Sequence, residues 1–294
     1  MDAGDLRVFE AVARLGGMNR AAVELNTVQS NVTSRIRLLE EQVGVPLFRR
    51  HSRGVVLTNA GERLLPYAMK VSRILKEAKR AVEDDGSPKG QLRIGSLETT
   101  AAYRLSPLIS RYGTSYPAVD LSLKTATNLT LIEDVLNHEL DGAFVCGPLD
   151  HPELEHTVVF NEELVIATAP GRSKFSSVAE NGGLKILVKG PGCAYRERLE
   201  EMLIRRGINI SRIEFGTLDA IVGCVAAGLG ETLLPQSVLA PAVRDKRVEI
   251  HRLPAVEARV ETLFIRRRDA FISSALAAFL EIALSVHGLA QAAE

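Results

Sequence analysis

The sequence lacks an excess of charge of either sign. It has 36 Lys and Arg against 36 Asp and Glu, so the formal net charge at pH 7 is zero over 294 residues. That balance excludes a uniformly basic nucleic-acid coat and an acidic disordered chain. Local charge differs, because residues 28–57 hold five arginines and two glutamates. The neutral average therefore hides a basic segment and leaves a slightly acidic remainder.

Cysteines and long apolar runs are also scarce. Cys146, Cys193 and Cys224 are too few for a disulfide framework. The first residues carry Asp2 and Asp5 and no basic segment before an apolar run, so no secretory signal is expected. No apolar run approaches the ~20 residues of a membrane-spanning helix. We expect a soluble, reduced, cytoplasmic protein with no membrane partner.

Motifs of the common enzyme classes are missing. The chain has no Gly-x-Ser-x-Gly nucleophile turn, no Walker A loop and no dinucleotide Gly-x-Gly-x-x-Gly. Cys146, His151 and His156 lie near one another in the sequence, but their spacing fits no metal site. We expect no enzyme activity, no cofactor and no metal.

The first sixty residues have the pattern of three short helices. Apolar residues at helical spacing begin at Leu6 and stop at Gly16-Gly17, and a second group spans Met18 to Leu25. A third helix begins near Thr27 and ends at Gly44. Its apolar stripe is Val28, Val32, Ile36, Leu39 and Val43. Its other face carries short polar and cationic side chains, the types that contact bases and phosphates: Gln29, Ser30, Asn31, Thr33, Ser34, Arg35 and Arg37.

A basic turn follows the third helix. Arg49, Arg50 and Arg53 lie in a glycine-containing turn between short apolar segments. This pattern predicts a β-hairpin wing whose basic tip lies along a phosphate backbone. A polar helix face or an arginine-rich loop is by itself usually only solvated. In this order, three helices and a wing predict a winged helix-turn-helix.

A long helix is predicted next, with Thr58 as its N-cap. Its apolar residues repeat every 3.5 positions, which is typical of a coiled-coil seam: Leu64, Ala68, Val71, Leu75, Ala78 and Val82. The alternative is a helix packed on its own chain. We favour a dimer, because one winged helix contacts only one half-site. Residues 83–90 end the helix and form a linker.

From residue 91 on, short apolar strands alternate with helices. Strands are expected at 92–94, 119–123, 143–145, 164–167, 186–188, 213–215 and 232–234, and helices at about 100–112, 129–140, 194–206 and 218–227. Such alternation implies parallel sheets, which bind ligands beyond the carboxyl ends of their strands. A strand break near 168–170 and a return near 264–265 suggest two lobes with two crossings.

Candidate ligand-binding residues follow from this geometry. Each lies after a strand or at the start of a helix, where amides and hydroxyls can bind a ligand: Ser96, Glu98, Thr99, Thr100, Thr127, Asn128, Cys193, Tyr195, Arg196, Thr217 and Asp219. A single Ser or Thr in such a place is more often an N-cap. The prediction rests on four strand ends meeting at one cleft.

These motifs together resemble the LysR-type transcriptional regulators. The resemblance begins with Phe9, Val12, Ala13, Ala21-Ala22, Leu25, Gln29, Arg35, Ile36, Leu39-Glu40, Gly44, Leu47-Phe48, Arg53-Gly54, Leu57-Thr58 and Ala60-Gly61. It continues in the segment Asp219–Pro235, with Glu231 where an apolar residue is usual. The usual Ser-Gln-Pro of the recognition helix is Val28-Gln29-Ser30 here, which leaves capping to Thr27 or Asn26.

The resemblance implies an organisation and a function. It implies a winged helix-turn-helix at 1–58, a linker and dimerisation helix with hinge at 59–90, and a periplasmic-binding-protein-like α/β effector domain at 91–294. Lobe I is expected at 91–167 and 266–294, and lobe II at 168–265. The implied partners are a double-stranded DNA operator, a small-molecule effector and further copies in a homodimer or homotetramer. RNA polymerase is a partner if the protein activates transcription.

Two features bear on the signal that such a regulator would detect. Glu98 and Asp219 would repel acids and favour a cationic amine, and residues 96–102 and 193–196 look similar to a subgroup tied to putrescine utilisation. Cys193 is expected at a helix start, where the dipole lowers a thiol pKa, so thiol or redox sensing is a rival hypothesis. A solute-binding protein and an enzyme with an α/β substrate domain are the alternatives of other classes.

Overall fold

The computed structural model describes residues 1–51, 54–171 and 184–291, with side chains except those of Arg50 and of residues 286–291. The chain forms two compact units, residues 1–84 and residues 85–294. The finer domain and lobe boundaries expected from the sequence stay predictions.

Three helices form the core of the first unit, as the apolar spacing predicted. They are α1 (Ala3–Leu15), α2 (Met18–Glu24) and α3 (Gln29–Val43). Helix α1 begins with a capping box between Asp2 and Asp5, and it ends at Gly16, whose φ of 66° suits glycine. Phe9 is fully buried at the centre of the unit, against the ring of Phe48.

The start of α3 differs from the expectation. Val28 is the N-cap residue, and no side chain caps the helix. Thr27 does not cap it, because its hydroxyl accepts a hydrogen bond from the Asn31 side-chain amide at 2.9 Å. Asn26 does not cap it either, since it occupies a turn with a positive φ of 51°. The first amides of α3 therefore receive no cap from a side chain.

The predicted wing is a short antiparallel hairpin, β1 (Phe48–His51) and β2 (Gly54–Leu57). Glu40 attaches it to α3, because its Oε1 accepts hydrogen bonds from the amides of Leu47 and Phe48 at 2.7 and 3.1 Å. Gly54 has a φ of 140°, and a Cβ there would lie 2.4 Å from the Gly16 carbonyl oxygen. Only glycine fits this close approach of the wing to α1.

Helix α4 (Asn59–Glu83) starts where the sequence predicted. The Thr58 hydroxyl accepts a hydrogen bond from the Gly61 amide at 3.1 Å. The same hydroxyl donates to the Pro46 carbonyl at 2.7 Å, which ties the helix start to the chain before the wing.

Among the described residues, seven strands of the second unit form one sheet, in the order β10-β6-β11-β5-β3-β4 with β9 also paired to β6. They are β3 (Gly90–Ser96), β4 (Val119–Thr125), β5 (Gly142–Cys146), β6 (Leu154–Thr168), β9 (Thr232–Pro235), β10 (Glu249–Arg252) and β11 (Arg259–Arg267). A separate parallel pair consists of β7 (Leu184–Lys189) and β8 (Ile210–Phe215).

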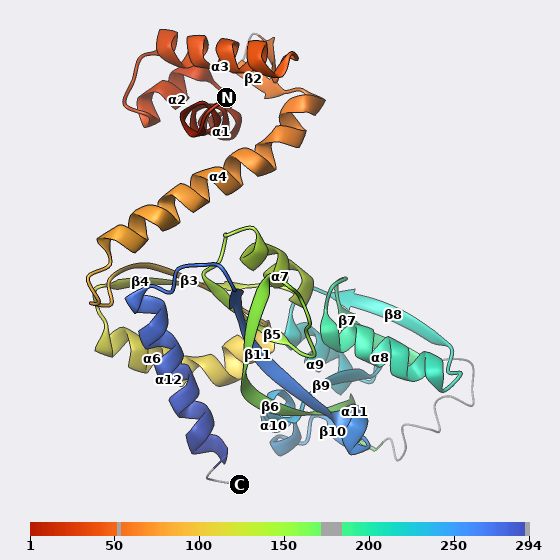
Figure 1. Cartoon of the computed structure of the whole chain (residues 1–294). Coiled ribbons are helices and arrows are strands. Elements are labelled where there is room, and N and C mark those ends of the chain that lie inside the picture. Colours follow the sequence, from red (N-terminus) through yellow and green to blue (C-terminus); the bar gives the residue numbers. More distant parts are fainter. Residues whose placement is uncertain (52–53, 172–183, 292–294) are drawn as a thin grey trace. The chain divides into compact units, whose positions relative to one another are not determined.

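Helices flank these strands. They are α5 (Glu98–Thr100), the π-helical turn η1 (Ala101–Leu105), α6 (Ser106–Ser115), α7 (Asn128–Leu136), α8 (Ala194–Arg205), α9 (Leu218–Ala226), α10 (Gln236–Arg244), α11 (Ala255–Ala258) and α12 (Ser274–Gln291). Helices α6 and α12 pack on one face of the β3–β5 region, around Phe144 and Phe279 (Figure 1). Helix α7 packs on the opposite face through Leu131 and Val135.

The expectation of parallel sheets is only partly right. Strand β3 is parallel to β4 and to β5, and β7 is parallel to β8. Strands β9, β10 and β11 instead run antiparallel to β6. The alternating pattern missed this because β6 and β11 are long strands that carry the chain between regions, with no helix to signal a crossover.

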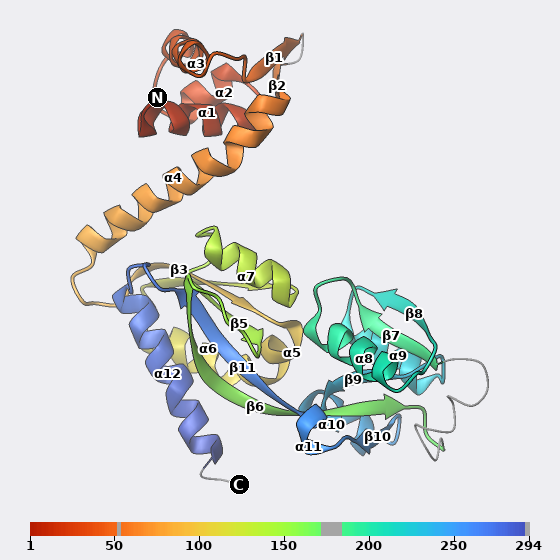
Figure 2. The same cartoon turned by 45° about the vertical axis from the view of Figure 1, so that its right-hand side comes forward.

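Two lobes result from the length of β6 (Figure 2). Its first part pairs with β11, and its last residues, Leu164 to Ala167, pair with β9. One strand therefore takes part in the first lobe around β3, β4 and β5 and in the second lobe around β7, β8 and β9.

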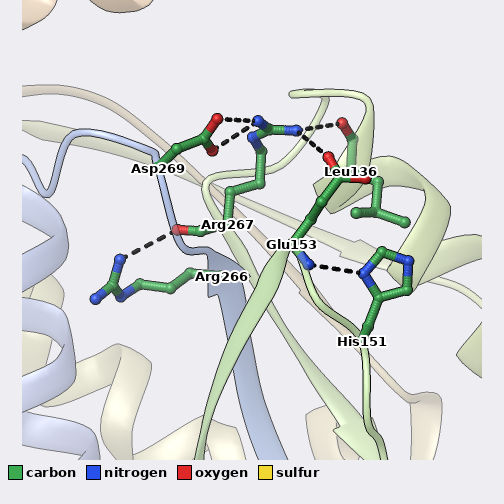
Figure 3. Close-up of polar contacts among 6 residues, drawn as sticks. All are labelled: Leu136, His151, Glu153, Arg266, Arg267 and Asp269. Atoms are coloured by element: carbon green, nitrogen blue, oxygen red, sulfur yellow. Dashed lines mark hydrogen bonds and ion pairs between the residues drawn. The ribbon is translucent and has the colours of Figure 1, made fainter.

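Helix α7 ends at Leu136, four residues before the predicted end. A buried arginine holds this end: the Arg267 guanidinium donates to the Leu136 carbonyl at 3.0 Å and to Asp269 at 2.5 and 2.6 Å (Figure 3). The Glu153 carboxylate also lies 3.7 Å from the Arg267 guanidinium. The chain then turns at His138, whose φ is 58°.

Candidate nucleic-acid interface and effector cleft

The polar face of α3 is open to solvent along most of its length. Gln29, Ser30, Asn31, Ser34 and Arg37 are exposed. Thr33 and Arg35 are half-buried. The opposite face is buried through Val32, Ile36 and Leu39, so the helix presents its hydrogen-bonding side chains outward on a fixed support.

A groove runs between α1 and α3. It is lined by Gly4, Arg7, Val8, Leu25, Thr27, Asn31, Val32 and Arg35. Arg35 lies 3.6 Å from the Asp5 carboxylate, which fixes its guanidinium at the groove. The exposed Arg7 adds a second cation that the sequence reasoning did not select. Arg7 is one of four charged residues of α1, so its position carried no distinct signal.

The predicted phosphate contacts differ in their surroundings. Arg37 pairs with Glu41 on the surface of α3, at 2.8 Å. Arg49 is exposed on β1. The Arg50 side chain and all of Arg53 lie outside the described residues, so their predicted roles remain predictions.

The seam of α4 divides into two halves. Ala68 is fully buried, and Leu64 and Val71 pack beside it against the core of the first unit. Leu75 and Val82 are 48% and 88% exposed, and Ala78 is exposed with them. Tyr67 and Ile74 add further exposed apolar surface. The first half therefore packs on its own chain, and the second half is free for a partner helix.

A cleft lies between the lobes of the second unit. It contains about 430 Å³ of empty space, part of it open to solvent. Five of the predicted residues line it: Glu98, Thr99, Thr127, Cys193 and Tyr195. The other lining residues are Leu97, Ala126, Lys189, Ala194, Leu218 and Leu234. Strand ends from both lobes do meet here, and most of the wall is apolar.

The remaining predicted residues do not line this cleft. Ser96 is buried and its hydroxyl donates to the Leu97 carbonyl. The Asn128 side chain exchanges two hydrogen bonds with the Cys146 backbone. Arg196 bonds Glu200, Glu214 and the Lys189 carbonyl.

Thr100, Thr217 and Asp219 also lie outside the cleft lining. Thr100 is buried, whereas Thr217 and Asp219 are exposed at the start of α9. Thr217 acts as the N-cap of that helix, since its hydroxyl accepts from the Ala220 amide at 3.4 Å.

Lys189 is the charged residue among the cleft residues that the sequence did not predict. Its ammonium group pairs with the Glu98 carboxylate across the cleft. The other oxygen of Glu98 accepts from the Leu218 amide at 3.3 Å. The Glu98 charge is thus already compensated, which removes the reason for expecting a cationic amine. The available signal was the position of Lys189, the last residue of a strand that points to the cleft.

Burial has the largest influence on the pKa of the Cys193 thiol and on the pKa of the Tyr195 hydroxyl. Burial raises the pKa of the Cys193 thiol, and the nearby backbone amides and Lys189 oppose this shift only in part. Burial also raises the pKa of the Tyr195 hydroxyl, which lies next to Thr99. The expectation of a lowered thiol pKa at Cys193 is therefore wrong, because loss of hydration outweighs the helix dipole.

The part of the chain that the structure describes lacks two further features. There, no group of three His, Cys, Asp or Glu side chains is placed to hold a metal ion. In the same residues, no helix combines the length and apolar character that a membrane span requires.

Family models match both units. The model described as bacterial regulatory helix-turn-helix protein, lysR family, matches residues 3–62. The model described as LysR substrate binding domain matches residues 85–287.

Individual proteins agree with the family models. The chain is 43% identical to the HTH-type transcriptional regulator GltR of Bacillus subtilis (strain 168), over 94% of this chain and 93% of that protein. It is 45% identical to the uncharacterized HTH-type transcriptional regulator YusT of the same strain, over 96% of this chain and 95% of that protein. In fold it is similar to full-length CbnR complexed with its target DNA, with a TM-score of 0.65 and 23% identity. The match covers 96% of this chain and 99% of that chain. The resemblance to a putrescine-utilisation subgroup finds no support among these relatives.

Proposed function

The chain belongs to the LysR family of transcriptional regulators, and we propose a separate role for each of its two units. The first unit binds operator DNA, with α3 in the major groove and the wing along the backbone. Ligand binding in the cleft of the second unit changes how the operator is engaged or bent. The family consists of regulators rather than enzymes, and we assign no catalysis to the cleft.

The exposed polar face of α3 is the observation that carries the DNA-binding proposal. Gln29, Ser30, Asn31, Thr33 and Ser34 are assigned to bases and sugars because their short side chains can approach base edges. Arg35, Arg37, Arg49, Arg50 and Arg53 are assigned to phosphates, and Arg7 joins them at the α1–α3 groove.

Assembly into dimers, or dimers of dimers, supplies a second winged helix. The exposed half of the α4 seam supports this, because Leu75 and Val82 leave apolar surface without cover. Two linked domains bind far more tightly than one, which a neutral chain with only a modest positive surplus in residues 28–57 needs. RNA polymerase is a further partner if the bound protein activates transcription.

The effector proposal rests on the cleft between the lobes. Its lining comes from both lobes, so a ligand bound there contacts both and biases their relative position. Redox sensing through Cys193 is the weaker alternative, since burial raises the pKa of that thiol and keeps it protonated.

A mobility-shift assay on the DNA flanking the protein's own gene tests the DNA-binding proposal. We expect a shifted complex that survives excess unrelated DNA and weakens steeply with salt. Equal competition by unrelated DNA would reject sequence-specific regulation and favour the solute-binding alternative.

A further inference from the structure

The Glu98 carboxylate joins the two lobes of the second unit. Glu98 is the first residue of α5, in the first lobe. One of its oxygens pairs with the Lys189 ammonium at the end of β7, and the other accepts from the Leu218 amide at 3.3 Å. Leu218 is the first residue of the nine-residue helix α9. A cation and a helix-terminal amide from the second lobe thus hold one carboxylate from the first.

This polar group lines a cavity that is otherwise mainly apolar. Leu97, Ala126, Ala194 and Leu234 supply apolar wall. The hydroxyl groups of Thr99 and Thr127 are the remaining side-chain polar groups along it apart from Cys193 and Tyr195. A ligand that matches this lining has one anionic end and a compact apolar body.

The Glu98–Lys189 ion pair is partly open to solvent, so another anion can reach Lys189. The side chains of Glu98 and Lys189 are 33% and 24% exposed. Because water already reaches both groups, the pair contributes little stability and opens at low cost. A deeply buried pair would resist opening, since separation would leave an uncompensated charge.

We propose that Lys189 and the Leu218 amide form a carboxylate subsite, that Glu98 is its built-in occupant, and that a small free carboxylic acid replaces Glu98 there. The inference rests on the proposed role of the cleft and names its ligand class. An amine cannot take this place, because Lys189 would repel it. Replacement frees Glu98 from the second lobe, which converts ligand binding into a change between the lobes.

Chemical rescue tests the subsite directly. Glu98→Ala in the full chain removes a group of the size and charge of acetate. At acetate concentrations tenfold above the midpoint of the titration, we expect the melting temperature of this variant to rise by about 3–5 °C. Chloride at equal ionic strength should produce no such rise, and neither should acetate with the wild type or with Glu98→Ala/Lys189→Gln. An absent rise, or an equal rise in the double variant, overturns the proposal.

A second variant covers the case in which Glu98→Ala does not fold. Glu98→Gln keeps the side-chain shape but competes weakly for Lys189, so calorimetry should show butyrate binding at least tenfold more tightly than to the wild type. n-Butylamine, with the same apolar body, should not bind. Lys185→Gln, at the exposed start of β7, is the control for lysine loss and should leave butyrate binding unchanged. Equal butyrate affinity in wild type and Glu98→Gln, or preferred binding of the amine, rejects the assignment.

Neither measurement involves DNA. A failed rescue therefore leaves the DNA-binding proposal intact, and a failed mobility shift leaves the carboxylate subsite to be judged on its own result.

Discussion

Cys193 shows how the surroundings of a single residue decide its chemistry. It is the N-cap residue of α8, a place where the helix dipole favours a thiolate. The thiol is nonetheless half-buried in the cleft, and the loss of hydration raises its pKa. The neutral thiol is the form expected at physiological pH, and it is a poor nucleophile.

Labelling of Cys193 as a function of pH checks this account. In a Cys146→Ala/Cys224→Ala background, we expect the rate with iodoacetamide at pH 7 to be at least tenfold below that of free N-acetylcysteine. Because the pKa is raised, the rate should keep rising at a pH where the reference thiol has levelled off. Faster labelling than the reference, or protection after peroxide, would instead support redox sensing.

Arg49 is the wing arginine whose side chain the structure places in solvent. Arg49→Ala should weaken binding to operator and unrelated DNA by a similar factor and lower the salt slope by about one. Fluorescence anisotropy at several salt concentrations measures both quantities. Arg205→Ala, on the exposed surface of α8, is the matched control and should change neither. A loss confined to the operator, with an unchanged slope, would assign Arg49 to a base.

At the scale of elements, Arg267 on β11 bonds the last residue of α7, Leu136. Arg267→Met would leave the Leu136 carbonyl without its donor and break the contact with Asp269. We expect a loss of about 1–3 kcal/mol in the free energy of unfolding. Arg205→Met removes an ion pair whose arginine is 75% exposed, so it should cost less than about 1 kcal/mol. Urea denaturation compares the two variants, and equal losses would contradict a structural role for Arg267.

Helix α4 makes two kinds of contact along one apolar stripe. Leu75→Glu places a charge in the exposed half, where we expect analytical ultracentrifugation to show a shift toward monomer with little change in melting temperature. Lys76→Glu introduces the same side chain at the neighbouring exposed position and should leave the assembly intact. A Leu75→Glu protein that assembles like the wild type would move the dimer contact away from this helix.

The elements with regular periodicity were predictable, and those defined by long-range pairing were not. The buried residues Val32, Ile36 and Leu39 of α3 and the cap of α4 at Thr58 follow from local rules. Val28, assigned to the same stripe, is instead 64% exposed, because it precedes the helix as its N-cap residue. The antiparallel pairing of β6 with β11 depends on residues about a hundred positions apart, which local patterns do not encode. The same limit applies to the cleft: Glu98 was selected, but its partner Lys189 lies 91 residues away and was missed.

For the whole molecule, the neutral total charge conceals a division of roles. The basic segment around α3 and the wing lies in the unit of residues 1–84, and the lobes with their cleft lie in residues 85–294. One unit suits a polyanion and the other a small ligand. We expect winged helices to bind the operator in pairs, because a single subunit offers only one recognition helix.

Hydroxyl-radical footprinting on the DNA flanking the protein's own gene tests whether two winged helices bind the operator together. For the wild type, we expect protected patches of backbone on one face of the duplex, about 10 base pairs apart or a multiple of that spacing. The pattern should be lost with Leu75→Glu at the same concentration. A single protected patch, or uniform protection at concentrations that shift the DNA, would contradict the account.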